Sequence, residues 1–166
     1  MSLFVKIADF DDICPKDKYT AITLQKYLDD LEEGYLIKLF GSTLFDEFKT
    51  DFEIIGTIPT EQRFLDVWNA FNTDNNSQIV TSIGIKKMLV GFIAFEFLRD
   101  EMVKKTIGGL VQNEQVNGVI ASFQSSDLLS LHNKSVLTFN SLRWFMNEDL
   151  TTYENYNGAW MSISIG

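Results

Sequence analysis

Apolar side chains recur at every third or fourth position along two long segments, which is the pattern of amphipathic helices. The first segment covers residues 20–40, with acidic residues between the apolar positions. The second covers residues 126–150, and its seam consists of Leu128, Leu131, Ser135, Phe139, Leu142, Met146 and Leu150. We therefore expect two long helices that each bury one face.

A third long helix is predicted over residues 82–105, because apolar residues occur on nearly every side of it between Met88 and Leu98. Gly84 and Gly91 are seven positions apart and would share one face of this helix. Each glycine costs about 1 kcal/mol of helix propensity relative to alanine. Their presence indicates that another helix packs closely against this face.

Shorter elements fill the chain between these helices. Gly41 is a natural end for the first helix, and Ser42 is in place to cap a short helix that runs to about Phe52. A threonine precedes the next short helix, which carries Phe64, Leu65, Trp68 and Phe71. Residues 72–77 read Asn, Thr, Asp, Asn, Asn and Ser, and these turn formers predict a polar loop.

The remaining segments predict extended appendages. Residues 106–122 contain three glycines and an Asn-Gly pair, which predict a long loop or a hairpin-like finger. Apolar and polar residues alternate near both ends of the chain, so we expect extended arms over residues 1–15 and 151–166. The expected fold is mainly α, a single-domain bundle of about five helices over residues 1–166 with these three appendages.

The composition excludes several classes of site. The chain has 166 residues, a formal net charge of −9, one cysteine and one histidine. The excess of acids argues against tight binding to nucleic acid or to an anionic membrane. One cysteine and one histidine provide neither an intrachain disulfide nor a zinc ligand set. No apolar run approaches the roughly 20 residues that span a bilayer.

The polar residues show no catalytic arrangement. His132 is interpreted as a boundary residue of its helix. Asp11 and Asp12 are close to Cys14 in the sequence and are expected to raise the pKa of its thiol, which predicts a poor nucleophile. A group of acids on the first helix resembles a cation site but is interpreted as a solvated face: Asp29, Asp30, Glu32 and Glu33. We therefore expect no enzyme activity, no cofactor and no metal.

The appendages favour a role in assembly. Strands with unpaired edges pair with each other or with a neighbouring copy. The candidate interface residues are Val5, Ile7, Gln112, Asn113, Asn117, Trp160, Met161, Ile163 and Ile165. The alternative is that both arms pack on their own domain, as in a monomeric helical module that binds a protein or a small ligand.

Four stretches of the chain carry a family resemblance. They are residues 27–44, residues 84–100, residues 106–111 and the Tyr-Asn-Gly sequence at 156–158. In this order they resemble the head–tail connector proteins of tailed bacteriophages, also called adaptor or head-completion proteins. The resemblance is strongest to those of phages that infect Bacteroidetes, including crAss-like phages.

The resemblance implies a helical virion protein that forms a homo-oligomeric ring between the portal protein and a tail or stopper protein. DNA would pass through the ring without tight binding, which suits the acidic charge of each copy. The family has no catalytic residues to transfer to this chain. The implied location is the virion, after assembly in the host cytoplasm.

Overall fold

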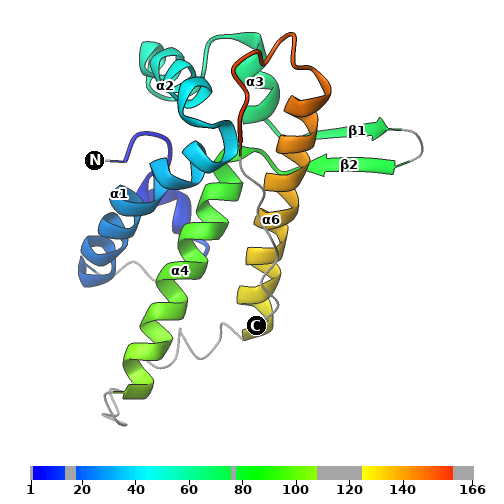
Figure 1. Ribbon diagram of the computed structural model, residues 1–166. Coiled ribbons are helices and arrows are strands. Elements are labelled where there is room, and N and C mark those ends of the chain that lie inside the picture. The colour runs from blue at the N-terminus through cyan, green and yellow to red at the C-terminus, as the bar shows by residue number, and fades with distance from the viewer. Residues whose placement is uncertain (1, 14–17, 76–77, 108–124, 159–166) are drawn as a thin grey trace.

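The computed structural model describes residues 2–13, 18–75, 78–107 and 125–158. Over these residues it contains five α-helices, a short 3-10 helix and one two-stranded sheet (Figure 1). The elements are η1 (Ile7–Phe10), α1 (Lys18–Phe40), α2 (Ser42–Ile55), α3 (Gln62–Trp68), β1 (Phe71–Asn75), β2 (Gln78–Ser82), α4 (Ile85–Ile107) and α6 (Ser125–Glu148). The expectation of a mainly α bundle is confirmed.

Helix α4 is the central element of the bundle. It contacts α1, α3, α6 and η1, and Figure 1 shows α6 running alongside it. This position explains why α4 is apolar on nearly every side. The helix begins at Ile85, because Gly84 adopts a φ of +88° that lies outside the helical region. Gly84 therefore precedes the helix and does not share a helical face with Gly91, contrary to the expectation.

Gly91 allows α4 and α6 to approach each other closely. A Cβ at this position would overlap Ser135 Oγ of α6 and would lie 3.4 Å from the carbonyl oxygen of Leu131. The Ser135 side chain is buried, and its hydroxyl donates to the Leu131 carbonyl at 3.2 Å. The single polar position of the predicted seam is thus a small residue that faces the glycine.

The rest of the α6 seam follows the prediction as far as the helix extends. The residues Leu128, Phe139, Leu142 and Met146 are buried, and Leu131 is partly buried. Leu150 lies beyond the end of the helix at Glu148 and exposes 51% of its surface. The prediction was therefore wrong only for the last turn.

Aromatic side chains join α2 to the start of the chain and to α3. The ring of Phe4 lies 5.2 Å from that of Phe48 and 4.7 Å from that of Phe52, and Phe52 lies 5.1 Å from Trp68. Offset and edge-on pairs at these distances are favourable beyond the area they bury. The N-cap position of α2 is Gly41, so Ser42 is not the capping residue that the sequence suggested.

The N-terminal arm is not an extended strand. Residues 7–10 form η1, and the side chains of Phe4 and Val5 are buried in the core. Val5 was a candidate interface residue, but its side chain is fully buried within its own chain. The expected exposed arm is therefore wrong for residues 2–13.

Glu32 of α1 is the physical cause of this arrangement. Its carboxylate accepts the backbone N–H groups of Leu3, Phe4 and Val5 at 2.7, 2.9 and 2.6 Å. Only 2% of Glu32 is exposed, so the interpretation of this residue as part of a solvated face is wrong. Burial raises the pKa of the Glu32 carboxyl, and the three amide groups act in the opposite direction. The carboxylate satisfies backbone donors that a strand would have offered to a partner.

The segment predicted as a polar loop is part of an antiparallel hairpin. Strand β1 pairs with β2 so that Phe71 lies opposite Ser82 and Asp74 lies opposite Ile79. The base of the hairpin packs on α6, where the ring of Phe71 lies 4.9 Å from that of Phe145. Figure 1 shows the hairpin projecting from the helical body on the side away from the N-terminal segment.

The chain after α6 turns back onto the bundle. Tyr153 is buried, and its hydroxyl donates to the backbone carbonyl of Arg63 at 2.7 Å. The N–H of Asn157 donates to the carbonyl of Phe40 at 3.2 Å. The C-terminal segment thus packs on its own domain as far as residue 158, and residues 159–166 lie outside the described residues.

We predict opposite effects of alanine at two helical glycines. Gly34→Ala, where a Cβ meets nothing within 4 Å, should raise the free energy of unfolding by about 0.5–1 kcal/mol. Gly91→Ala should lower it by about 1–2 kcal/mol, because the new methyl group pushes against α6. Equilibrium unfolding in urea checks both values, and equal stabilisation by the two substitutions would contradict the close packing at Gly91.

We also predict that Glu32→Gln lowers the free energy of unfolding by about 2 kcal/mol, because the amide removes one acceptor and the negative charge. Hydrogen–deuterium exchange at the amides of Leu3, Phe4 and Val5 should become faster. Asp30→Asn, on the exposed side of the same helix, is the matched control and should change stability by less than about 0.5 kcal/mol. Unchanged exchange in Glu32→Gln would show that the carboxylate does not hold this segment.

Candidate functional site

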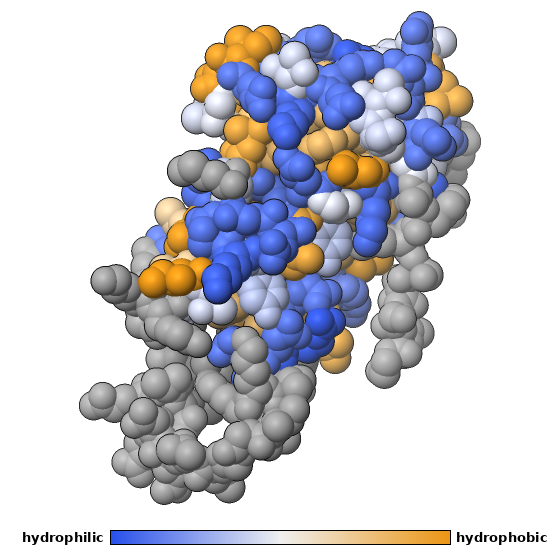
Figure 2. Space-filling model, turned by 60° about the vertical axis from the view of Figure 1, so that its left-hand side comes forward, coloured by the Kyte–Doolittle hydropathy of each residue, from blue (hydrophilic) through white to orange (hydrophobic). Residues whose placement is uncertain are grey.

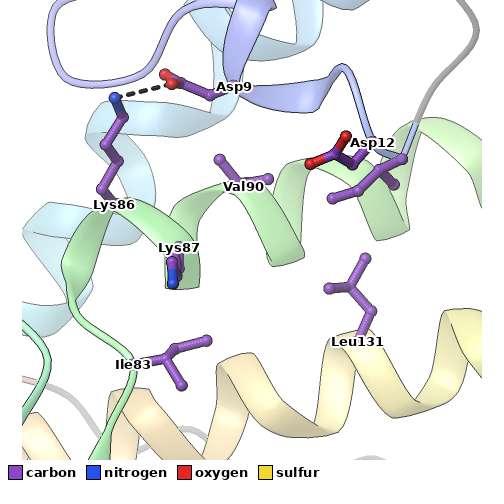
Figure 3. Close-up of a pocket in the computed structure, with 8 residues that line it drawn as sticks. Asp9, Asp12, Ile83, Lys86, Lys87, Val90 and Leu131 are labelled. Atoms are coloured by element: carbon purple, nitrogen blue, oxygen red, sulfur yellow. Dashed lines mark ion pairs between the residues drawn. The ribbon is translucent and has the colours of Figure 1, made fainter.

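A pocket of about 420 Å³ lies between the N-terminal segment, α4 and α6 (Figure 3). Its lining combines four apolar and four charged side chains: Ile13, Ile83, Val90, Leu131, Asp9, Asp12, Lys86 and Lys87. Asp9 and Asp12 come from the segment that Glu32 holds in place, and the lysines come from the first turn of α4. The pocket therefore depends on three separate parts of the fold.

The charged groups of the pocket differ in their pairing. Lys86 Nζ forms an ion pair with Asp9 Oδ1 at 2.8 Å, which Figure 3 shows as a dashed line. The other carboxylate oxygen of Asp9 accepts the backbone N–H of Lys6 at 2.8 Å. Lys87 and Asp12 are both exposed. The pocket thus offers an apolar lining with charges of both signs beside it, which suits an apolar group that carries a polar neighbour.

The single histidine packs against aromatic side chains of α4. The His132 ring packs 4.3 Å from the ring of Phe95 and 5.7 Å from that of Phe92. Burial lowers the pKa of His132, which favours the neutral form of its imidazole. Its position agrees with the interpretation as a boundary residue, and Cys14 lies outside the described residues.

The acids of α1 do not converge on a common point. Glu32 turns inward, Glu33 pairs with Lys49 Nζ at 2.6 Å, and Asp29 accepts a hydrogen bond from Gln25 at 2.9 Å. The hydrogen bond from Gln25 lowers the pKa of Asp29. Within residues 2–13, 18–75, 78–107 and 125–158, no group of three or more His, Cys, Asp or Glu side chains is placed to hold a metal ion.

The hairpin presents one packed face and one exposed face. The side chains of Phe71, Thr73, Val80 and Ser82 are partly or fully buried, whereas those of Asn72, Asp74, Ile79 and Thr81 are exposed. Ile79 exposes 75% of its surface, the largest fraction among the exposed large apolar residues of the described chain. Sequence reasoning missed this residue, because a polar loop was expected at this point.

A second exposed apolar surface lies at the C-terminal end of α2. Ile54, Ile55 and Ile58 expose 70%, 56% and 45% of their surfaces. Ile54 also lines a shallow acidic hollow with Asp46, Glu47, Thr50, Asp51, Glu61 and Arg63. Figure 2 shows apolar groups at the upper end of one face and at several places lower down, interspersed with polar groups.

The candidate interface residues fall into two groups. Val5 is buried in the core and Ile7 is partly buried against it, so neither lies on an exposed strand. The others lie outside the described residues: Gln112, Asn113, Asn117, Trp160, Met161, Ile163 and Ile165. The structure does not bring the two described candidates onto an exposed surface. The hairpin and the end of α2 carry exposed apolar residues, and so do α1 at Ile22 and α6 at Leu137.

Asp51 of α2 holds the turn that leads into α3. Its carboxylate accepts the N–H of Thr60 at 2.7 Å, the N–H of Glu61 at 3.1 Å and the hydroxyl of Thr60. Burial acts to raise the pKa of Asp51, but the hydrogen bonds and the nearby Arg63 outweigh it and lower the pKa below 3.8. The ionised carboxylate is therefore part of the native structure at neutral pH.

Comparisons with protein-family models, curated proteins and solved structures give no significant match to this chain. Among the helices of the described residues, none is both long and apolar enough to cross a membrane.

The lowered pKa of Asp51 predicts a pH-dependent stability. The contribution of this carboxylate is present above the ordinary pKa of 3.8 and is lost as the pH falls through the lower native pKa. Asp51→Asn should lower the free energy of unfolding by about 2 kcal/mol at neutral pH, and its difference from the wild type should shrink at lower pH. Urea unfolding of the wild type and of Asp51→Asn, measured from neutral pH down to below the ordinary pKa of 3.8, checks this difference. Asp46→Asn, on the exposed face of α2, is the control, and a difference that does not vary with pH would contradict the account.

Proposed function

We propose that this chain is a structural subunit of a bacteriophage virion, which forms a homo-oligomeric ring between the portal protein and the tail. The observation that carries the proposal is the hairpin that projects from the helical body (Figure 1). A two-stranded hairpin is marginally stable in water unless something packs against it. Here one face of the hairpin packs on α6, and the other face carries the exposed Ile79. In this proposal a neighbouring copy covers that second face.

The backbone of the hairpin supports the same proposal. A two-stranded sheet has two edges, and unpaired strand edges favour pairing with another chain. In the described residues the only strands are β1 and β2, which pair with each other. A neighbouring copy that covers the exposed face would complete the burial that this chain begins.

The charge of the chain suits a ring through which DNA passes. A net charge of −9 per copy, repeated around a ring, repels phosphate groups and keeps DNA from binding tightly to the wall. The resemblance of residues 27–44 and 84–100 to head–tail connector proteins supports the same role. In this proposal the protein has no catalytic activity and no cofactor.

The isoleucine surface on α2 supplies a contact to a different component of the virion. Ile54 lines the acidic hollow at the end of α2, and Ile55 and Ile58, which follow it in the chain, are exposed as well. We assign this surface to the portal or to the tail protein, because the hairpin is assigned to the neighbouring copy. The chain would assemble in the host cytoplasm and remain in the virion.

The pocket favours a second candidate function. A pocket of about 420 Å³ with an apolar lining falls within the range for small-ligand sites, roughly 300–1,000 Å³. A monomeric helical module that binds a peptide or a small molecule would use this pocket directly. Such a module would not depend on Ile79.

Light scattering coupled to size-exclusion chromatography tests the two candidates. The wild type should form a discrete oligomer as its concentration rises, and Ile79→Ser should weaken this association at least about tenfold, because one isoleucine side chain would no longer be buried. Ile54→Ser, at a comparably exposed isoleucine, is the matched control and should leave self-association unchanged. A wild type that stays monomeric at every concentration would contradict the ring and favour the binding module.

A further inference from the structure

We propose that the acidic hollow at the end of α2 binds a basic segment of a different protein, which places an apolar side chain against Ile54 and a cationic side chain against Asp46. This inference deepens the proposed function, on which it rests for the identity of that protein as a portal or tail component. The residues of the hollow supply the chemistry that the partner must have.

Ile54 gives the hollow an apolar contact point. The hollow has a volume of about 430 Å³, and the described residues that line it are polar or charged except for Ile54. This side chain exposes 70% of its surface, and Ile55 and Ile58 after it are exposed as well. Full burial of one isoleucine side chain contributes about 1.5–3 kcal/mol. A partner therefore gains most by covering Ile54 with an apolar side chain.

The charges of the hollow favour a basic partner. Four acids and one arginine line it: Asp46, Glu47, Asp51, Glu61 and Arg63. The arginine is already engaged by two of the acids, because its Nη2 lies 3.0 Å from Glu47 Oε2 and its Nε lies 2.6 Å from Glu61 Oε2. The excess of negative charge is therefore left for a cation from another molecule.

Asp46 is the acid that is best placed to receive this cation. It is exposed, and within the described residues its carboxylate takes part in no hydrogen bond or ion pair. The Lys49 ammonium is bonded to Glu33 at 2.6 Å instead; this bond is the main cause that raises the pKa of Lys49, and the charge of Asp46 adds to it. A new cationic side chain beside Asp46 would thus displace no existing partner.

Asp46 and Ile54 share one face of α2. Residues four apart on a helix are neighbours, so Asp46, Thr50 and Ile54 follow one another along the outer side, and all three are exposed. At 1.5 Å per residue, Asp46 and Ile54 lie about 12 Å apart along the helix axis. A partner helix that runs alongside would meet both with a basic and an apolar residue seven or eight positions apart.

Other classes of partner fit the hollow less well. In the parts of the chain that the structure describes, no group of three or more His, Cys, Asp or Glu side chains is placed to hold a metal ion. Nucleic acids and anionic lipids carry the same sign of charge as the hollow and are repelled. A second copy has a net charge of −9, so it is repelled overall too. These exclusions favour a basic segment of a different protein.

The hollow is held in shape before a partner arrives. Asp51 fixes the turn that leads into α3. The chain after α6 adds two further bonds: Asn155 Nδ2 donates to Glu47 Oε1 at 2.6 Å, and the Tyr153 hydroxyl donates to the carbonyl of Arg63 at 2.7 Å. A preformed surface loses little conformational freedom on binding, which favours affinity.

The hollow and the hairpin lie on different sides of the body. Figure 1 shows α2 at the upper left and the hairpin at the right. One copy can therefore contact a neighbouring copy through the hairpin and the different protein through the hollow at the same time.

Binding of a designed peptide to the wild-type chain tests the proposal. The probe is a fluorescent helical peptide of alanine, leucine and lysine, with leucine and lysine seven positions apart on one face, and its counterpart has glutamate in place of lysine. Fluorescence anisotropy should show saturable binding of the lysine peptide that weakens as salt is added. The glutamate peptide should bind at least about tenfold more weakly. Equal affinities for the two peptides, or no binding of the lysine peptide, would overturn the proposal.

Matched variants on two helices show whether the hollow is the binding site. Ile54→Ser and Asp46→Lys should each weaken binding of the lysine peptide at least about fivefold. Ile22→Ser and Asp30→Lys make the same changes at exposed positions of α1, and each should change binding by less than about twofold. All four positions are exposed, so the fold should be retained, and circular dichroism checks this. Equal losses on the two helices would overturn the proposal, because the peptide would then be binding the overall acidic charge.

Light scattering on the same variants separates this inference from the proposed function. Ile54→Ser and Asp46→Lys should leave self-association of the chain unchanged. A chain that forms rings but does not bind the lysine peptide contradicts this inference alone. A chain that stays monomeric and binds the peptide through Ile54 and Asp46 contradicts the ring and supports the binding surface.

Discussion

The close approach of α4 and α6 at Gly91 is the constraint on which the rest of the structure depends. The glycine faces the buried Ser135, so the two helices meet with almost no side chain between them at this point. The same two helices contribute Val90 and Leu131 to the pocket, and α6 supports the base of the hairpin through Phe145. The hairpin and the pocket are therefore both supported by this helix pair.

The third wall of the pocket depends on a single buried carboxylate. Glu32 collects three consecutive backbone N–H groups and so brings the start of the chain onto the bundle. The segment that follows supplies Asp9 and its ion pair with Lys86. A buried charge is costly unless hydrogen bonds satisfy it, and here the backbone itself provides them. The N-terminal segment thereby forms one wall of the pocket.

Much of the helical fold could be predicted from the sequence, because the 3.6-residue period of α1, α4 and α6 is visible in their apolar residues. The hairpin could not, since β1 consists largely of Asn, Thr and Asp and is stabilised by Phe71 against α6 rather than by strand propensity. The role of Glu32 could not be predicted either, because its partners lie 27 to 29 residues away in the chain. Its local neighbours Asp29, Asp30 and Glu33 indicated a solvated face. The pocket could not be predicted either, because its lining residues come from segments that lie far apart in the chain.

Electron microscopy of the concentrated wild-type protein tests the central claim most directly, because it shows the symmetry of the assembly and not only its mass. The account predicts closed rings with a central opening, in which each hairpin reaches the neighbouring copy. Two-fold dimers, in which identical surfaces meet, would contradict it, and so would a uniform field of single copies.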